Sequence, residues 1–370
     1  MDHILGQSAA IEVLTRAVAN GRLHHGLIFY GPWGVGKFTT AVALAKILLC
    51  HDLQMDLAGN PCACDGCEAC KLMDSSDAAH PDLHVIHKDQ AEHSSVSTLR
   101  NRKRTNIPVD LLRERVVGGT TGDDKYHEPA AAKSPVMNHN KIFIIDEAEL
   151  MAAHGQNALL KTLEEPSPGT FFILVTTSDT RLLPTIRSRC QRVCFGPLTD
   201  QIVSDFIAKA DHNLSQQEMD WLLPFAAGSV GRAQQIIENN LLEWCQVVFP
   251  ALEALTNGRQ SPTLGSDMTK LVDDFAAAEA GKDKSASKEA ANRMSSNLML
   301  QMIAQFASRK LTSLSAQGLG EEALDPWLHV IDGLRKVESE LASNVNMRIC
   351  FEHLASLIAR AFIKPAAVAR

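Results

Sequence analysis

The sequence predicts an α/β fold in which a parallel sheet carries helices on both faces and is followed by regions made only of helices. Short apolar runs of strand length alternate with helical patterns over residues 26–195. A glycine-rich turn joins the first apolar run to a helix. Beyond residue 200 the patterns are helical, and no convincing strand pattern remains.

The expected elements follow the chain in order. A helix is expected near residues 4–18, and the run GLIFY at residues 26–30 is typical of a buried parallel strand. The next helix covers TTAVALAKILLC, and a later one covers GQNALLKTLEEP and stops at Pro166. Four further strands are expected within DLHVIH (82–87), KIFIIDEAELM (141–151), TFFILVTTS (170–178) and RLLPTIRSRCQRVCF (181–195). Residues 88–140 are polar and irregular apart from a helix around PVDLLRERVV.

Length and composition are those of a globular chain. The 370 residues, 45% hydrophobic and 21% charged, allow about two or three domains. A formal net charge of −7 argues against a protein that coats nucleic acid by itself, because such proteins need a large cationic surface. No apolar run is long enough to span a bilayer, and the first residues do not read as a signal peptide, so we expect a cytoplasmic protein without membrane contact.

The turn GPWGVGKFTT has the design of a phosphate-binding loop. Backbone N–H groups at a helix N-terminus can face an anion while a lysine neutralises the outer phosphates. The residues expected to bind the nucleotide are Gly31, Gly34, Gly36, Lys37 and Thr39. Phe38 stands where such loops carry the Ser or Thr that ligates Mg²⁺. Thr39 is rotated by about 100° around the helix and is not expected to replace that ligand directly. The glycines and the lysine of this loop therefore predict a binding site for ATP with Mg²⁺. Phe38 argues against that prediction because its side chain cannot ligate the metal.

Two carboxylates end the strand at residues 141–145. Asp146 and Glu147 resemble the acidic pair of a nucleotide site, in which the first holds the metal and the second orients the attacking water. Both acids could instead favour the dipole of a following helix. The pair and the glycine loop together predict a nucleotide site far more specifically than either alone.

Four cysteines lie within CACDGCEAC at residues 62–70. Cys64, Cys67 and Cys70 have the Cys-x-x-Cys spacing that lets one turn deliver two thiolates to a metal. In a cytoplasmic chain this pattern favours zinc over disulfides. A site with four thiolates has no open position for water, so the predicted zinc is structural.

The segments HHGLIFYGPWGVGK, IIDEAELM, NALLKTLEEP and IRSRCQRVCF occur in this order. Together they closely resemble bacterial DNA polymerase III clamp-loader subunits, which are AAA+ proteins. The resemblance covers residues 1 to about 240, and the remainder only in its helical character. It implies an AAA+ domain at 1–199 with a zinc module at 50–70, a small helical lid domain at 200–242 and a helical collar or oligomerisation domain at 243–370.

The same resemblance assigns roles to individual residues. Arg189, within Ser-Arg-Cys, would act as an arginine finger that enters the ATP site of a neighbouring subunit. The fourth zinc ligand would be Cys50 at the end of the preceding helix, with Cys62 as the competitor.

Two branches of the family must be separated, the ATP-hydrolysing gamma/tau subunit and the delta-prime subunit. Phe38 and Arg187 match the delta-prime pattern, and so does Gly231, where gamma/tau carries an arginine. We therefore expect a delta-prime-type subunit that assembles with gamma/tau and delta subunits to load the sliding clamp on primed DNA in the replisome. The rivals are a gamma/tau-type ATPase that binds and hydrolyses ATP itself and an unrelated AAA+ remodelling protein. The role of residues 88–135 stays open.

Overall fold

A computed structural model describes residues 1, 4–57, 59–75, 80–100, 106–137, 140–210, 214–259, 261–282, 288–343 and 345–362. The chain divides into two compact units, Met1–Ile202 and Val203–Arg370. Each unit is described by itself below.

The first unit is built on a five-stranded parallel sheet with the strand order β4-β7-β8-β1-β9. The strands are β1 (Gly26–Tyr30), β4 (Leu83–Ile86), β7 (Lys141–Ile145), β8 (Thr170–Thr176) and β9 (Gln191–Cys194). All five lie where the sequence predicts them. Every residue of β7 is buried, as its continuous apolar run predicts for a strand covered on both faces.

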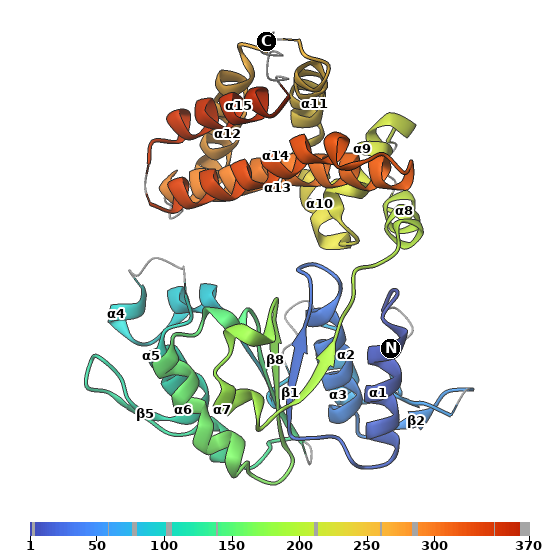
Figure 1. Ribbon diagram of the computed structural model, residues 1–370. Helices are drawn as coiled ribbons and strands as arrows, with labels where there is room; N and C mark the ends of the chain where they lie inside the picture. The colour runs from blue at the N-terminus through green and yellow to red at the C-terminus, as the bar shows by residue number, and fades with distance from the viewer. Residues whose placement is uncertain are drawn as a thin grey trace, which may run out of the picture. The chain divides into compact units, whose positions relative to one another are not determined.

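Helices cover both faces of this sheet (Figure 1). On one face, α1 (Ser8–Ala19) and α2 (Lys37–Leu49) form a buried core with Leu27 and Phe29. On the other face, α5 (Val109–Leu112), α6 (Ala153–Glu164) and α7 (Pro184–Arg187) form a second core. Phe143 and Phe172 are fully buried in that second core and stack with ring centroids 5.0 Å apart. The α/β fold class expected from the sequence is confirmed.

Short elements fill the connections of the first unit. Two small hairpins, β2 (Gln54–Met55) with β3 (Pro61–Cys62) and β5 (Gly119–Thr120) with β6 (Tyr126–His127), are not predicted by the sequence. The helix expected around residues 108–117 is α5 followed by a π-helical turn, Arg113–Val117. The remaining short helices are α3 (Glu68–Met73), α4 (Ser97–Arg100), η1 (Lys88–His93), η3 (Ala130–Ala132), η4 (Ala148–Leu150) and η5 (Asp179–Arg181).

The second unit is helical throughout its described residues, as the sequence predicts. It begins within α8 (Asp200–Lys209) and continues with α9 (Gln216–Ala226), α10 (Val230–Glu238), α11 (Leu242–Thr256), α12 (Leu264–Lys282), α13 (Lys288–Ala316), α14 (Glu321–Ala342) and α15 (Met347–Phe362). The long helices α13 and α14 run side by side (Figure 1). Among the described residues of the whole chain, no helix is both long enough and apolar enough to cross a membrane.

Candidate functional site

The glycine loop follows β1 and is packed against the end of β9. Gly31 has φ +141°, and a Cβ atom there would lie 2.0 Å from the carbonyl oxygen of Phe195. Gly34 and Gly36 also have positive φ values, 72° and 97°. These positions require glycine for backbone reasons, because a side chain would be strained or would collide. Gly36 directly precedes α2, so the loop leads into a helix N-terminus as expected.

Lys37 is buried, and its ammonium group is engaged by the loop itself. Nζ donates hydrogen bonds to the carbonyl oxygens of Gly31 at 2.7 Å and Pro32 at 2.5 Å. Burial lowers the pKa of Lys37, an effect that the nearby Glu149 and Asp146 carboxylates oppose. A phosphate group could bind the Lys37 ammonium group only by replacing these carbonyl oxygens as the acceptors of its hydrogen bonds.

The position after Lys37 has no oxygen to offer a cation. The Phe38 residue is 38% exposed, and with Thr39 and Met73 it lines a cavity of about 300 Å³. The next two residues of α2 both carry a hydroxyl group: Thr39 is exposed and lines this cavity, whereas Thr40 is fully buried and donates to the Gly36 carbonyl at 2.8 Å.

The predicted acidic pair stands at the end of β7. Asp146 Oδ1 accepts a hydrogen bond from the Glu147 backbone N–H at 2.9 Å. Burial raises the pKa of Asp146, as do the Glu147 and Glu149 carboxylates, while Lys37 lowers it. Glu147 has a left-handed backbone with φ 48° and forms an ion pair with Lys88, with Nζ and Oε1 2.8 Å apart. Its carboxylate is thus already held by a cation of the same chain.

A third carboxylate, Glu149, belongs to this region and was not predicted from the sequence. Its Oε1 accepts hydrogen bonds from Thr177, from the backbone N–H at 3.0 Å and from the hydroxyl at 2.5 Å. Burial raises the pKa of Glu149, but these two bonds outweigh burial and lower it overall. Thr177 directly follows β8, so only the strand order reveals that the two residues meet.

The sheet brings these groups to one edge. β7, β8 and β1 are adjacent, and the acidic pair, Thr177 and the glycine loop follow their carboxyl ends. Ligands of open parallel sheets bind outside this edge. The residues predicted for nucleotide binding are therefore at one location.

Arg189 lies at the opposite, amino-terminal ends of the strands. It precedes β9, whereas the glycine loop follows β1, and the five residues of β1 span roughly 16 Å. The Arg189 side chain is 35% exposed, and it forms an ion pair with Glu164 in which Nη2 and Oε1 are 2.5 Å apart. Nη1 donates to the Thr185 carbonyl at 3.0 Å and to the Ser188 hydroxyl at 3.3 Å. Its place in the fold directs Arg189 away from the chain's own loop.

The cysteine cluster is assembled from the end of α2, the turn before α3 and the first turn of α3. The Sγ atoms of Cys50, Cys64, Cys67 and Cys70 all lie within 4.8 Å of one another. The Sγ atoms of Cys50 and Cys67 are 4.0 Å apart, as are those of Cys64 and Cys70. Tetrahedral zinc with Zn–S bonds of about 2.3 Å requires sulfur atoms roughly 3.8 Å apart, so the four thiols fit that ion. The cluster could hold a metal ion.

Backbone N–H groups donate hydrogen bonds to the sulfur atoms of this cluster. The N–H groups of Cys64 and Cys67 point at the sulfur atoms of Cys50 and Cys64, at 3.3 and 3.4 Å. Such donors orient thiolates around a metal. Burial raises the pKa of Cys67, but hydrogen bonds from Cys70 and His51 outweigh it and lower that pKa to about 6. Cys62 pairs with Gln54 in the β2–β3 hairpin and is not a member of the cluster.

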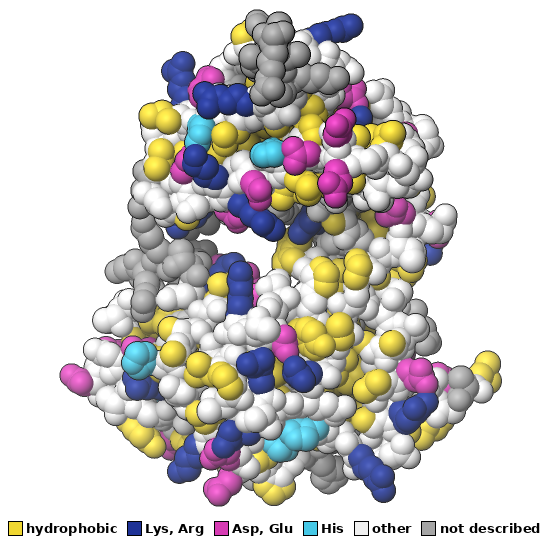
Figure 2. Space-filling model, viewed as in Figure 1, with side chains coloured by type: hydrophobic (Ala, Val, Ile, Leu, Met, Phe, Trp, Pro, Cys, Tyr) yellow, Lys and Arg dark blue, Asp and Glu magenta, His cyan; other side chains and the backbone are white. Residues whose placement is uncertain are grey.

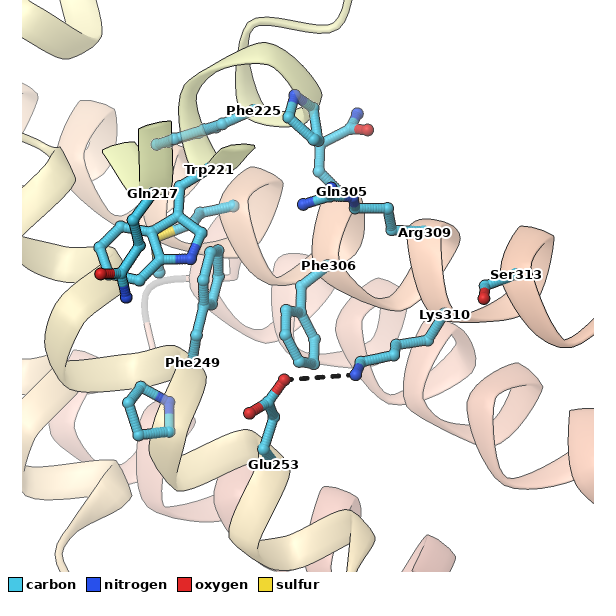
Figure 3. A pocket seen from close by; sticks show the side chains of 13 residues that line it. Gln217, Trp221, Phe225, Phe249, Glu253, Gln305, Phe306, Arg309, Lys310 and Ser313 are labelled. Atoms are coloured by element: carbon cyan, nitrogen blue, oxygen red, sulfur yellow. Dashed lines mark hydrogen bonds and ion pairs between the residues drawn. The ribbon is translucent and has the colours of Figure 1, made fainter. Parts of the chain in front are cut away.

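The second unit contains a cavity of about 370 Å³ between α9, α11 and α13 (Figure 3). Trp221, Phe249 and Phe306 supply its aromatic lining. At one side Lys310 forms an ion pair with Glu253, with Nζ and Oε1 3.3 Å apart. None of the residues predicted from the sequence for nucleotide or metal binding lines this cavity.

The basic side chains on one face of the molecule are dispersed (Figure 2). On the face drawn in Figure 2, Lys and Arg side chains are scattered in small groups among acidic, hydrophobic and polar ones. The described residues on this face of Figure 2 therefore lack the concentrated basic patch that proteins use to bind a nucleic-acid backbone.

The strand order, the glycine loop after β1 and the carboxylates after β7 define a P-loop protein of the AAA+ class. A family model described as "DNA polymerase III, delta subunit" matches residues 6–199, more than half of the chain. The chain belongs to this family of clamp-loader subunits.

Curated relatives come from both branches. DNA polymerase III subunit delta' of Bacillus subtilis (strain 168) is 30% identical over 234 residues, 63% of this chain and 60% of that protein. Subunit delta' of Pseudomonas aeruginosa is 33% identical over 57% of this chain and 55% of that protein. Subunit gamma/tau of Mycobacterium tuberculosis (strain ATCC 25618 / H37Rv) is 32% identical over 56% of this chain and 30% of that protein. The chain thus matches 60% or less of the length of these relatives, and their identities do not separate the two branches.

A solved structure also aligns with the chain. It is a DNA polymerase III gamma subunit-related protein from Thermotoga maritima, 14% identical with a TM-score of 0.43, and the alignment covers 96% of this chain and 100% of that one.

Proposed function

We propose that the chain is a delta-prime-type subunit of a DNA polymerase III clamp loader. It assembles with gamma/tau and delta subunits, helps to place the sliding clamp on primed DNA, and supplies Arg189 to the ATP site of a neighbouring subunit. The observation that carries this proposal is the position of Arg189. It is partly exposed at the amino-terminal end of β9, about the length of a strand away from the chain's own glycine loop, and this position supports a role at a site on another chain.

The features of the chain's own nucleotide site support a subunit that does not hydrolyse ATP itself. Phe38 removes the hydroxyl that completes the Mg²⁺ shell, and Lys37 is engaged by two loop carbonyls. The carboxylate of Glu147, which would orient the attacking water, is paired with Lys88. ATP and Mg²⁺ are therefore assigned to the neighbour.

Assembly is the direct test of this function. The purified chain is mixed with gamma/tau and delta subunits, and the mixture is passed over a size-exclusion column. We expect one peak that contains all the subunits in fixed ratio. An unrelated AAA+ remodelling protein would elute alone, and that result would refute the proposal.

A gamma/tau-type ATPase is the second candidate, and one observation favours it: the loop glycines, Lys37 and Asp146 are all in place at one edge of the sheet. This candidate predicts ATP turnover by the isolated chain that collapses in Lys37→Ala. The delta-prime proposal predicts no turnover above background in either protein.

Restoring the missing hydroxyl should change nucleotide binding. Phe38→Thr is expected to raise the affinity for a fluorescent ATP analogue about tenfold when Mg²⁺ is present, because the new oxygen can join the metal shell. The affinity is measured by fluorescence titration with Mg²⁺ and with EDTA. Phe38→Leu, which removes the ring without adding an oxygen, is the matched control. Equal affinities for the Thr and Leu variants would contradict the explanation.

We further propose that Cys50, Cys64, Cys67 and Cys70 hold a structural Zn²⁺. The four-thiol donor set and its spacing support this ion. We also propose that residues 200–242 act as the lid and residues 243–370 as the collar of the assembled complex. These assignments rest on the family resemblance.

A further inference from the structure

A carboxylate of the same chain holds the proposed arginine finger. Glu164 is the last residue of α6, and its Oε1 lies 2.5 Å from Nη2 of Arg189. An acidic residue at a helix C-terminus faces the negative end of the helix dipole, which is unfavourable. Glu164 is therefore not placed there to stabilise its own helix, and its partner Arg189 supplies another reason for its position.

The end of α6 that carries Glu164 is fixed to the rest of the unit. His25, just before β1, donates from Nε2 to the carbonyl oxygen of Leu163 at 2.9 Å. At the other end of α6, buried Gln156 accepts a hydrogen bond from the Leu183 backbone N–H at 2.7 Å, which ties α6 to the start of α7. Glu164 therefore lies at the end of a helix that is tied to α7, and Arg189 lies in the turn that follows α7.

The bonds that hold Arg189 leave part of its guanidinium group available. The guanidinium has five N–H donors. Nη1 donates twice, to Thr185 and Ser188, and Nη2 donates once, to Glu164. Three donors are used and two remain, enough for contacts with phosphate oxygens. We propose that Glu164 is a positioning residue that orients Arg189 toward the ATP of a neighbouring subunit.

The ion pair between Glu164 and Arg189 is of a strength that can orient the arginine side chain without fixing it in place. The Arg189 and Glu164 side chains are 35% and 46% exposed. Ion pairs with this exposure are weak, because water screens the two charges. The pair therefore limits the rotamers of a long side chain without trapping it, and a held guanidinium loses less entropy when it meets the transition state.

This inference rests on the proposed function, and its test separates the two. The full complex of this chain with gamma/tau and delta subunits, the sliding clamp and primed DNA is assayed for kcat and KM of ATP hydrolysis. Glu164→Gln is expected to lower kcat at the site served by Arg189 about two- to fivefold, which corresponds to the loss of such an ion pair, with KM for ATP unchanged. Glu165→Gln, the neighbouring carboxylate at the C-cap of α6, is the matched control and should behave as wild type.

Further variants complete the test. Glu164→Asp keeps the charge and should retain part of the lost kcat. Glu164→Gln added to Arg189→Ala should cause no further loss, because the two residues act as one unit. Unchanged kcat in Glu164→Gln overturns the inference, and so does raised kcat, which would mean that Glu164 holds Arg189 back. If Arg189→Ala itself leaves turnover unchanged, the proposed arginine finger fails as well.

Discussion

Arg189→Ala is expected to slow ATP hydrolysis on the order of 10³-fold at the one site of the assembled complex that this chain faces. An arginine finger stabilises charge that develops on the transferring phosphoryl group, and in phosphoryl-transfer enzymes this contribution is about 10³ to 10⁵ in kcat. The chain's own site should be unaffected, because Arg189 lies beyond the opposite ends of the strands that carry the glycine loop. Single-turnover hydrolysis in the complex, with clamp and primed DNA present, measures the loss as one slow phase.

The control for this experiment is a neighbouring arginine. Arg192 lies three residues on in β9 and forms an ion pair with Asp179, with Nη1 and Oδ2 3.0 Å apart. Arg192→Ala should leave every phase of hydrolysis close to wild type while the complex still assembles. If Arg189→Ala gives the same rates as Arg192→Ala, this chain supplies no catalytic group to its neighbour.

Cys67→Ser is expected to remove the bound zinc and to destabilise the first unit. Elemental analysis should give about one zinc per wild-type chain, since four thiolates bind one ion, and none in the variant. A ligand present at 1,000 times its Kd stabilises the folded state by about 4 kcal/mol. For a unit of this size that loss lowers the midpoint of thermal unfolding by roughly 8–16 °C.

Cys62→Ser tests the ligand set. Cys62 is the cysteine nearest to the cluster in sequence, but it lies in the β2–β3 hairpin. This variant should keep its zinc and its thermal midpoint. Loss of zinc from Cys62→Ser together with its retention in Cys50→Ser would exchange the roles of the two residues.

Much of the fold follows from local patterns in the sequence. GLIFY and KIFII are continuous apolar runs, and strands covered on both faces need such runs, so both strands were predicted where they occur. The two small hairpins in the first unit were missed because each has strands of two residues, too short to show alternation. The glycine loop was placed correctly because its backbone needs glycine at fixed positions.

The partners of the functional side chains could not be predicted in this way. Lys88 and Glu147 are 59 residues apart and meet because β4 lies beside β7. Glu164 lies near the end of the helix predicted to stop at Pro166, and nothing in that local sequence indicates Arg189 as its partner. Sequence spacing identifies residues that act within one turn or helix, as with the Cys-x-x-Cys pairs. Pairs formed across the sheet depend on strand order, which no local pattern contains.

Gly31 gives the glycine loop a structural role in packing that does not depend on a bound nucleotide. Its missing side chain lets the loop close onto the Phe195 carbonyl just after β9, while Arg189 stands just before the same strand. Gln7 also links the glycine loop to the segment after β9, because its side-chain amide donates hydrogen bonds to the carbonyl oxygens of Val35 and Gly196 at 3.2 and 2.8 Å. The loop therefore packs against the end of β9, the strand that begins two residues after Arg189. A subunit that never binds ATP would still need its glycine at residue 31, because any larger residue would push that strand out of line.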